Sequence, residues 1–318
     1  MKVYTVTLNP AYDVHATVDG FAAEKENFAT VLSRDAGGKG VNVSRALLCG
    51  GAENGVENGV KKGVENTAIV VIGSENGDEF KNRLQREGLR CVFLERAGRI
   101  RENLTLHAEN GQETRISFSG FTLDDTIFDE LDGVLDVGEG DIVAFTGSVP
   151  SGVSINRVKS FLKGLKDRGV RLAVDSRSLS IADITEIEPW LVKPNEEEFV
   201  KYFGVEVNGF DDCVLYATEL SLNGVENVMV SLGERGAMLA ADGLYIATPP
   251  KIKALSTIGA GDSSIAGFIS AFIADTGAAN CVKTAVAYGT AACLTDGTNP
   301  PKKSDIDEIL KGVQLREY

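Results

Sequence analysis

The chain has 318 residues, 43% of them hydrophobic, which is enough for one large α/β domain or two small ones. It carries 32 Lys and Arg residues against 46 Asp and Glu residues, so its formal net charge is −14. Such a surface argues against nucleic acids and anionic membranes as partners. No apolar run approaches the ~20 residues that a membrane span needs.

The cysteine and histidine content further narrows the class of protein and the kinds of site to expect. The five Cys residues are scattered, odd in number and without a C-x-x-C pair, which is typical of reduced thiols in a cytoplasmic protein. The only histidines are His15 and His107, so a histidine-based metal site or catalytic triad is not expected. Residues 1–8 alternate in β-branched side chains and predict a strand rather than a signal peptide.

Two polar candidates follow this opening strand. Asp13 lies just past its C-terminal end, where open α/β sheets place ligands, although a turn aspartate is an equally good interpretation of this residue alone. Residues 37–40 (Gly-Gly-Lys-Gly) then form a glycine-rich loop that enters a helix. The loop lacks the G-K-[ST] ending of a Walker A sequence. Its adjacent glycines would still allow close backbone contact with a sugar hydroxyl or a phosphate.

Several short alternating runs do not fit a parallel core. They cover residues 14–18, 29–33, 104–108 and 116–118, and an Asn-Gly pair at 110–111 predicts a hairpin between the last two. We interpret them as a small β lid built from segments 9–35 and 97–121. Such a lid would exclude bulk water from a site beneath it. Its exposed strand edges would invite pairing into a homodimer.

A near-perfect four-residue repeat occupies residues 55–66. It lengthens the connection between the helix that follows the glycine-rich loop and a strand expected at 68–72. No residue of the repeat suggests chemistry. We therefore predict a surface insertion over residues 53–67.

Strands and helices alternate regularly in the second half of the chain. Buried strands are expected at 141–145, 171–175, 190–193 and 227–230, which predicts a parallel sheet covered on both faces. Asn195 and an acidic run follow the third of these strands, and the run by itself would be a solvated helix start. The C-terminal edge of the sheet should gather the polar candidates: Asp13, the loop at 37–40, Ser148, Asn195, Ser231 and Asp262.

The stretch at 256–262 (Ser-Thr-Ile-Gly-Ala-Gly-Asp) opens directly into a helix with a single apolar stripe. A helix N-terminus has unpaired N–H groups and a positive dipole end, and both favour an anion. Asp262 would repel a phosphate there unless it takes a proton from a nearby nucleophile, which is what phosphoryl transfer to a hydroxyl needs. An aspartate that merely caps the helix is the alternative.

Together, the early and late glycine-rich stretches resemble the two signatures of the ribokinase/PfkB family of carbohydrate kinases. Matching stretches run over nearly the whole chain in the same order. The resemblance implies a single α/β domain over residues 1–318 with the ribokinase-like three-layer fold, in which a mainly parallel central sheet carries a small β-sheet lid. It also implies ATP and Mg²⁺ as cofactors.

The resemblance assigns a role to each matching residue. Gly259, Ala260 and Gly261 would form the anion hole beside the catalytic base Asp262. The sugar phosphate would be bound by Asp13, Gly37, Gly38, Lys39, Asn42, Arg101 and Asn103. The nucleotide would be bound by Lys193, Asn195, Ser231, Gly233, Gly236 and Thr257. Asn195 and Glu198 would hold Mg²⁺ through water.

The N-P-A-x-D sequence ending at Asp13 is most similar to the phosphofructokinase and tagatose-phosphate kinase branch of the family. Residues 117–121 are more similar to 1-phosphofructokinases. We therefore expect ATP-dependent phosphorylation of a ketohexose phosphate, with D-fructose 1-phosphate giving fructose 1,6-bisphosphate. The alternatives are a tagatose-6-phosphate kinase or another sugar kinase of the same family.

Two other classes of protein are weaker interpretations. A dinucleotide-dependent oxidoreductase would use the start of G-x-G-x-x-G at Gly259, but Ser264 occupies the sixth position and no βαβ unit follows. A sugar-binding regulator without chemistry would not need Asp262 or the glycines before it. Nucleotide-dependent turnover of a phosphosugar separates the kinase from both alternatives.

Overall fold

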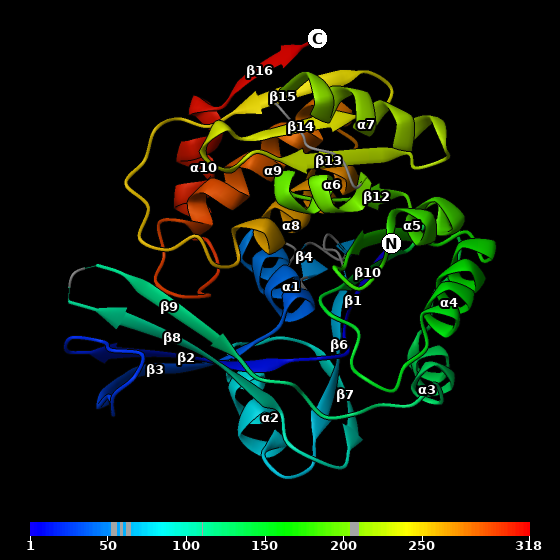
Figure 1. Ribbon diagram of the computed structural model, residues 1–318. Coiled ribbons are helices and arrows are strands. Elements are labelled where there is room, and N and C mark those ends of the chain that lie inside the picture. The colour runs from blue at the N-terminus through cyan, green and yellow to red at the C-terminus, as the bar shows by residue number, and fades with distance from the viewer. Residues whose placement is uncertain (52–55, 58–59, 62–64, 110, 204–209) are drawn as a thin grey trace.

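The computed structural model describes residues 1–51, 56–57, 60–61, 65–109, 111–203 and 210–318. A ten-stranded sheet forms its centre, in the order β16-β15-β14-β13-β12-β11-β10-β1-β6-β7 (Figure 1). The strands in chain order are β1 (Lys2–Thr7), β6 (Glu65–Gly73), β7 (Cys91–Arg96), β10 (Ile142–Thr146), β11 (Arg171–Asp175), β12 (Leu191–Val192), β13 (Asn227–Ser231), β14 (Ala237–Ala240), β15 (Leu244–Thr248) and β16 (Gln314–Glu317).

The sheet is parallel from β7 to β13 and antiparallel from β13 to β16. The parallel strands read as continuous apolar runs because helices cover both faces. In β10, for example, every residue is buried. All parallel strands therefore end at one edge, which is where ligands bind in open α/β sheets.

Helices form a layer on each face of the sheet, each around its own apolar core. One layer contains α1 (Lys39–Cys49), α8 (Ala260–Ile273), α9 (Ala278–Ala292) and α10 (Lys303–Gly312). The other contains α2 (Gly77–Arg86), α3 (Ile127–Val134), α4 (Ile155–Asp167), α5 (Ile181–Ile187), α6 (Glu196–Phe203) and α7 (Phe210–Leu222). The predicted three-layer fold with a mainly parallel sheet is confirmed.

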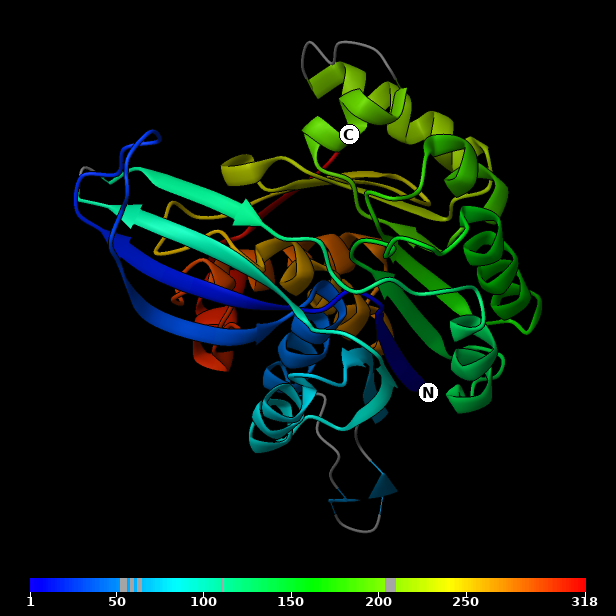
Figure 2. The same cartoon turned by 60° about the horizontal axis from the view of Figure 1, so that its bottom comes forward.

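A separate four-stranded sheet projects from this body, as Figures 1 and 2 show. Its order is β3 (Ala29–Gly37), β2 (Ala11–Val18), β8 (Arg101–Ala108) and β9 (Glu113–Ser117). Strands β2 and β8 pair in parallel, although α1, β6, α2 and β7 lie between them in the sequence. The predicted smaller sheet is confirmed, while Asn110 of the expected hairpin turn lies outside the described residues.

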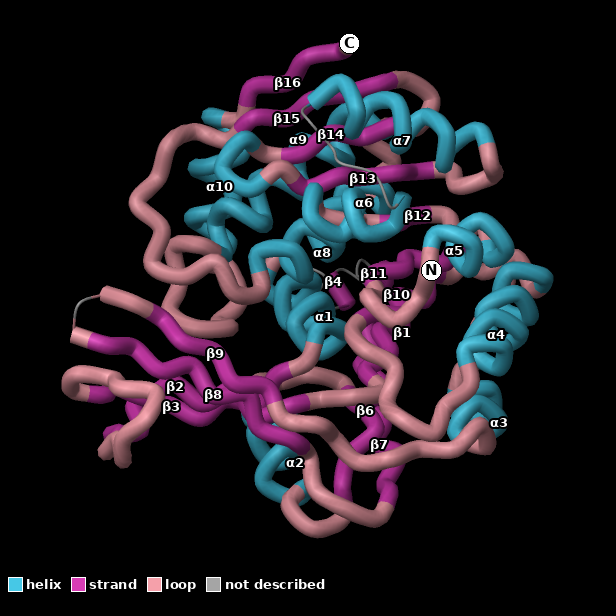
Figure 3. The backbone as a smooth tube through the Cα atoms, viewed as in Figure 1, coloured by secondary structure: helices cyan, strands magenta, loops and turns pink. Residues whose placement is uncertain are grey.

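The two faces of this small sheet differ in chemistry, because successive side chains of a strand point to opposite faces. Asp13, His15 and Asn103 lie on one face, because Asp13 pairs with Asn103 in the register of β2 and β8 and His15 is two residues from Asp13. A Cβ atom at Gly297, in the loop after α9, would lie 3.4 Å from Nε2 of His15, so this face lies against the body of the protein. Figure 3 shows the small sheet as a blade beside the helices of the first layer.

The insertion predicted at 53–67 lies largely outside the described residues, apart from the short pair β4 (Val56–Glu57) and β5 (Val60–Lys61). Its predicted C-terminal boundary is wrong. Residues 65–67 belong to β6 and pair with β1 inside the central sheet. Asn66 is buried there and exchanges hydrogen bonds with Ser44 of α1. The strand therefore begins three residues earlier than the apolar run alone indicates.

All five cysteines lie in the described part of the chain, and none forms a disulfide there. Across the described residues, no helix combines the length and the apolar character that crossing a bilayer requires.

Candidate active site

The turn that opens α8 has the geometry expected of an anion cradle. Gly259 is its N-cap residue and adopts a left-handed conformation with φ of 78°, which favours glycine. Among the described residues, no side chain caps this helix end. Ser256 Oγ supports the turn by accepting from the Ile258 amide at 3.2 Å and donating to the Gly297 carbonyl at 3.2 Å. Thr257 lies in the same turn, and its carbonyl accepts from the amide of Ala260.

Asp262 does not cap its own helix. Its side chain is buried, and Oδ2 accepts a hydrogen bond of 2.9 Å from Nδ2 of Asn42. Burial raises the pKa of Asp262 to about 6, and the negative charge of Asp175 adds to the rise. The charges of Lys39 and Lys193 and the hydrogen bond from Asn42 act in the opposite direction. A carboxylate with such a pKa is ionised at neutral pH and still basic enough to accept a proton.

The α1 helix fixes the orientation of Asn42. Nη1 of Arg45 donates to Oδ1 of Asn42 at 3.3 Å, which leaves the amide nitrogen to face Asp262. Arg45 is itself held by Glu87, whose carboxylate lies 2.6 Å from Nε. Asn42 was predicted to bind substrate, and the structure places its amide group on the expected catalytic base.

A buried cluster of charges lies beside Asp262. Asp175, the last residue of β11, has a side chain only 3% exposed, and it pairs with Lys39 at 2.9 Å and with Lys193 at 3.6 Å. Burial by itself would raise the pKa of Asp175, but Lys193 and Lys39 outweigh that effect and lower it. Burial likewise opposes the charge on Lys39, whose pKa is nevertheless raised by Asp175, Asp262 and Glu198.

Lys193 reaches from β12 to the α8 turn. A Cβ atom at Gly261 would lie 3.0 Å from Nζ of Lys193, so the glycine leaves room for the ammonium group directly at the helix N-terminus. Two attractions for an anion therefore coincide there, the positive dipole end of the helix and a lysine charge. Asp175 was not predicted as a site residue, although its place at the end of a buried parallel strand was a usable signal.

Asp13 and Asn103 form the next part of the site, on the small sheet. Nδ2 of Asn103 donates to Oδ1 of Asp13 at 2.9 Å, and desolvation raises the pKa of Asp13. A Cβ atom at Gly37 would lie 2.0 Å from Oδ2 of Asp13, so any side chain at this position would displace the Asp13 carboxylate. Gly38, with φ of 145°, similarly lies against Thr7. The early glycines thus bring α1 close to β1 and β2.

Arg101 lies next to this pair, and its hydrogen-bond acceptors among the described residues are all neutral oxygens. Its Nη2 is 3.4 Å from the Asn9 carbonyl, and its Nη1 is 3.5 Å from Oδ1 of Asn103 and from the Phe118 carbonyl. Its Nε and Oδ1 of Asn9 are both buried and have no partner among the described residues. The site therefore offers one unmet donor and one unmet acceptor, which suits a ligand that has both phosphate oxygens and hydroxyl groups.

The residues expected to bind nucleotide and metal gather at the ends of β12 and β13. Asn195 forms an isolated bridge with Ser231, and the Ser231 amide donates to the Pro194 carbonyl at 3.0 Å. Oδ1 of Asn195 accepts from the Glu198 amide at 2.7 Å, and Oε2 of Glu198 accepts from the Asn195 amide at 3.1 Å. These reciprocal bonds are a capping box at the start of α6. The glycines of the next turn, Gly233 and Gly236, both have positive φ.

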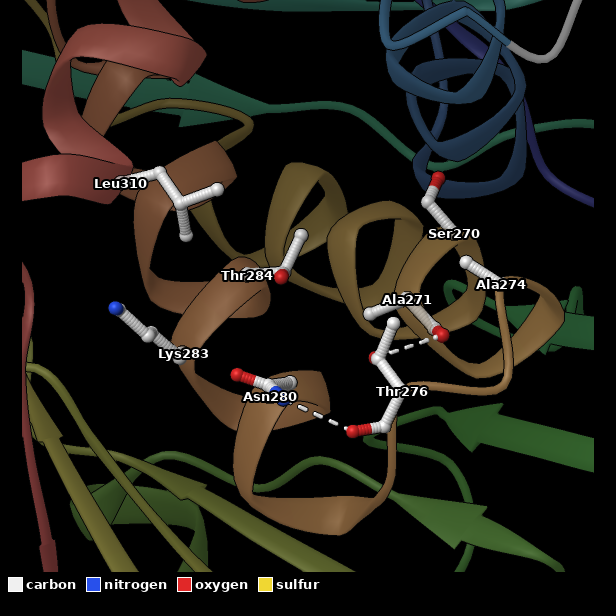
Figure 4. Close-up of a pocket in the computed structure, with 8 residues that line it drawn as sticks. All are labelled: Ser270, Ala271, Ala274, Thr276, Asn280, Lys283, Thr284 and Leu310. Carbon is white, nitrogen blue, oxygen red and sulfur yellow. Dashed lines mark hydrogen bonds between the residues drawn. The ribbon is translucent and has the colours of Figure 1, made fainter.

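Two cavities of the structure lie away from Asp262. One of about 430 Å³ is found at the far end of α8, and its lining, shown in Figure 4, contains none of the predicted site residues: Ser270, Ala271, Ala274, Thr276, Asn280, Lys283, Thr284 and Leu310. A second, of about 290 Å³, lies behind α1 and includes Arg45 and Glu87. The site around Asp262 is therefore defined by its converging polar groups and not by either cavity.

Comparison with known proteins identifies a family and several similar sequences and structures. Residues 6–305 match the pfkB family carbohydrate kinases. The chain is 31% identical to 1-phosphofructokinase of Bacillus subtilis, with 92% of this chain and 93% of that protein covered. It is 28% identical to 1-phosphofructokinase of Escherichia coli K12, with 100% of this chain and 99% of that protein covered. Its fold is similar to phosphofructokinase-2 from Escherichia coli in complex with substrates and products, with a TM-score of 0.87, 28% identity and coverage of 98% and 99%.

Proposed function

Because this chain belongs to the pfkB family of carbohydrate kinases, we propose that it transfers the γ-phosphoryl group of ATP to a hydroxyl group of a ketohexose phosphate. D-Fructose 1-phosphate, giving fructose 1,6-bisphosphate, is the preferred substrate, since the similar proteins of B. subtilis and E. coli are 1-phosphofructokinases. The observation that carries the proposal is the buried Asp262 beside a helix N-terminus and two lysines.

The geometry supports the following division of work. The carboxylate of Asp262 accepts the proton of the attacking sugar hydroxyl as its oxygen bonds to the γ-phosphorus, and ADP leaves with the electrons of the broken P–O bond. The amides at the start of α8 and Nζ of Lys193 face the anionic phosphates and stabilise the charge on the transferring group. Asn42 holds the carboxylate of Asp262 in place.

The residues of the site also fit Mg²⁺. This ion keeps most of its waters and is bound by one or two carboxylates together with substrate phosphates. Glu198 fits that description, because its charge contributes to the raised pKa of Lys39 and it therefore lies within electrostatic range of the site, with Asn195 beside it. When bound, Mg²⁺ would neutralise the charge of the nucleotide phosphates.

The decisive test is ADP release by the purified wild-type protein with ATP, Mg²⁺ and a panel of acceptors. The panel contains fructose 1-phosphate, tagatose 6-phosphate, fructose 6-phosphate and fructose. We expect the highest kcat/KM with fructose 1-phosphate. A preference for tagatose 6-phosphate would select the alternative substrate, and no turnover of any acceptor would contradict the function.

We also propose that two copies of the chain associate through the apolar face of the small sheet. Val31 of β3 is 61% exposed, and Ile116 and Phe118 of β9 and its extension are 40% and 53% exposed. By strand alternation and register these side chains share the face of Val14 and Leu104. A second copy would bury this patch of large side chains on a projecting sheet, which a monomer would leave in water. An E. coli structural relative has a tetrameric form.

The association can be tested by sedimentation velocity. The double substitution Val31→Asp and Ile116→Asp should convert dimers to monomers, because it places charges in the buried face. Leu222→Asp, at the exposed end of α7, is the matched control and should leave the dimer intact. A wild-type monomer at micromolar concentration would contradict the proposal. The cytoplasmic location stays a prediction.

A further inference from the structure

The anion site around Arg101 has only one guanidinium among the residues discussed so far. Lys39 was expected to be the second cation, but it is engaged with the buried Asp175 at 2.9 Å, and Asp262 also acts on it. Its charge is therefore balanced at the reacting end of the site. A phosphate that is already on the sugar would need another positive group close to Arg101.

Arg177 is such a group. It follows β11 by two residues, at the C-terminal edge of the central sheet, and its side chain is exposed. Over the described ranges it forms no ion pair and no side-chain hydrogen bond, although the chain has a net charge of −14. Burial lowers the pKa of Arg101, the negative charge of Asp13 raises it, and the positive charge of Arg177 lowers it further. Arg177 is therefore close enough to Arg101 for the two positive charges to repel each other.

A chain of short contacts connects the loop that carries Arg177 with Arg101. Oγ of Ser178 accepts from the Val149 amide at 3.0 Å, and the adjacent Ser148 accepts at 3.0 Å from Nδ2 of Asn9. The Asn9 carbonyl is in turn the acceptor for Arg101, at 3.4 Å. The loops after β1, β10 and β11 are thus held together around the two arginines.

We propose that Arg177 is a specificity-determining residue that, together with Arg101, binds the phosphate already present on the sugar substrate. Neither guanidinium group forms an ion pair among the described residues, so the two positive charges repel each other in the free protein. A dianionic phosphate removes that repulsion and accepts from both planar forks, including the unpaired Nε of Arg101. The inference deepens the proposed function and rests on it.

The test compares wild type with Arg177→Gln on fructose 1-phosphate and on fructose. Loss of one charge-assisted contact should lower kcat/KM for the phosphosugar on the order of 10–100-fold. Fructose carries no phosphate, so kcat/KM for it should change by less than about 3-fold. Arg177→Lys should give an intermediate value, since a point charge replaces the fork.

Arg316→Gln is the matched control, because it removes the same charge from the exposed strand β16 at the far edge of the central sheet. It should leave both sugars unaffected. Equal losses on both sugars with Arg177→Gln, or no loss on either, would overturn the inference while the wild-type activity still supports the kinase. A wild-type protein that turns over no phosphosugar would instead contradict the proposed function.

Discussion

Nδ2 of Asn42 donates a hydrogen bond of 2.9 Å to Oδ2 of Asp262 across a sequence separation of 220 residues. The contact joins the two glycine-rich stretches of the chain, one at the start of α1 and the other at the start of α8. It also holds the carboxylate that should take the proton from the sugar. The site therefore depends on the packing of α1 against α8.

Replacing Asp262 with Asn keeps the size of the side chain and removes its basicity. We expect kcat to fall by roughly 10²–10⁴ with little change in ATP affinity, because proton transfer and not nucleotide binding is lost. Single-turnover kinetics and nucleotide binding by calorimetry measure the two effects separately. A variant with near-wild-type turnover would exclude Asp262 as the base.

The same substitution should affect stability in a pH-dependent way. Burial raises the pKa of Asp262 from 3.8 in its ordinary state to about 6 in the folded protein. Because this carboxyl pKa is raised in the folded protein, the group does not reduce the free energy of unfolding below about pH 4, where it is protonated in both states. The free energy of unfolding falls as the pH rises from about 4 to about 6, because the buried group then has to ionise. Asp262→Asn should therefore be more stable than wild type at pH 8, by at most about 3 kcal/mol, and equal to it at pH 3.5. Urea unfolding at both pH values tests this, and equal stability at pH 8 would contradict it.

Asp175 should influence catalysis through Lys39, Lys193 and Asp262. Its negative charge raises the pKa of Asp262, and its removal would also leave both lysines free to lower that pKa. Asp175→Asn should therefore move the acidic limb of the kcat profile to lower pH, while kcat itself falls because the lysines lose their anchor. A reduced kcat with an unchanged limb would mean that Asp175 supports only the fold.

Glu198→Gln tests the metal role. The variant keeps an oxygen that can accept from the Asn195 amide, so the capping box at α6 should survive. If Glu198 organises Mg²⁺, the concentration needed for half-maximal rate should rise. Thermal unfolding serves as the control for helix integrity. Unchanged metal dependence would leave Glu198 as a helix cap alone.

Much of the fold was predictable because periodicity reports burial directly. The apolar runs of the parallel strands, such as residues 141–145 and 171–175, and the alternation in segments 104–108 and 116–118 each correspond to a strand. The boundary of β6 was missed because Glu65 and Asn66 are polar, and Asn66 is buried only through its bonds to Ser44. A polar residue with a distant partner leaves no periodic signal.

The sequence indicated which polar residues gather at the sheet edge better than it indicated which of them are in contact. Asp13, Asn103 and Asp262 lie among the groups with which they were expected. The pairing of Lys39 with Asp175 and the approach of Arg177 to Arg101 depend on the alignment of β10, β11 and the following loops. Such alignment is set by packing over the whole sheet, so a single sequence does not contain it in readable form.

One sheet carries both the residues that we propose bind the sugar and the exposed apolar patch. Asp13 and Asn103 lie on one face of β2 and β8, and Val31 and Ile116 lie on the other face of the same hydrogen-bonded strands. If a second copy orders that sheet, sugar affinity and self-association become thermodynamically reciprocal. Dilution would then weaken sugar binding, and sugar would tighten the dimer. Affinities measured at nanomolar protein would describe a different species from the one at cellular concentration.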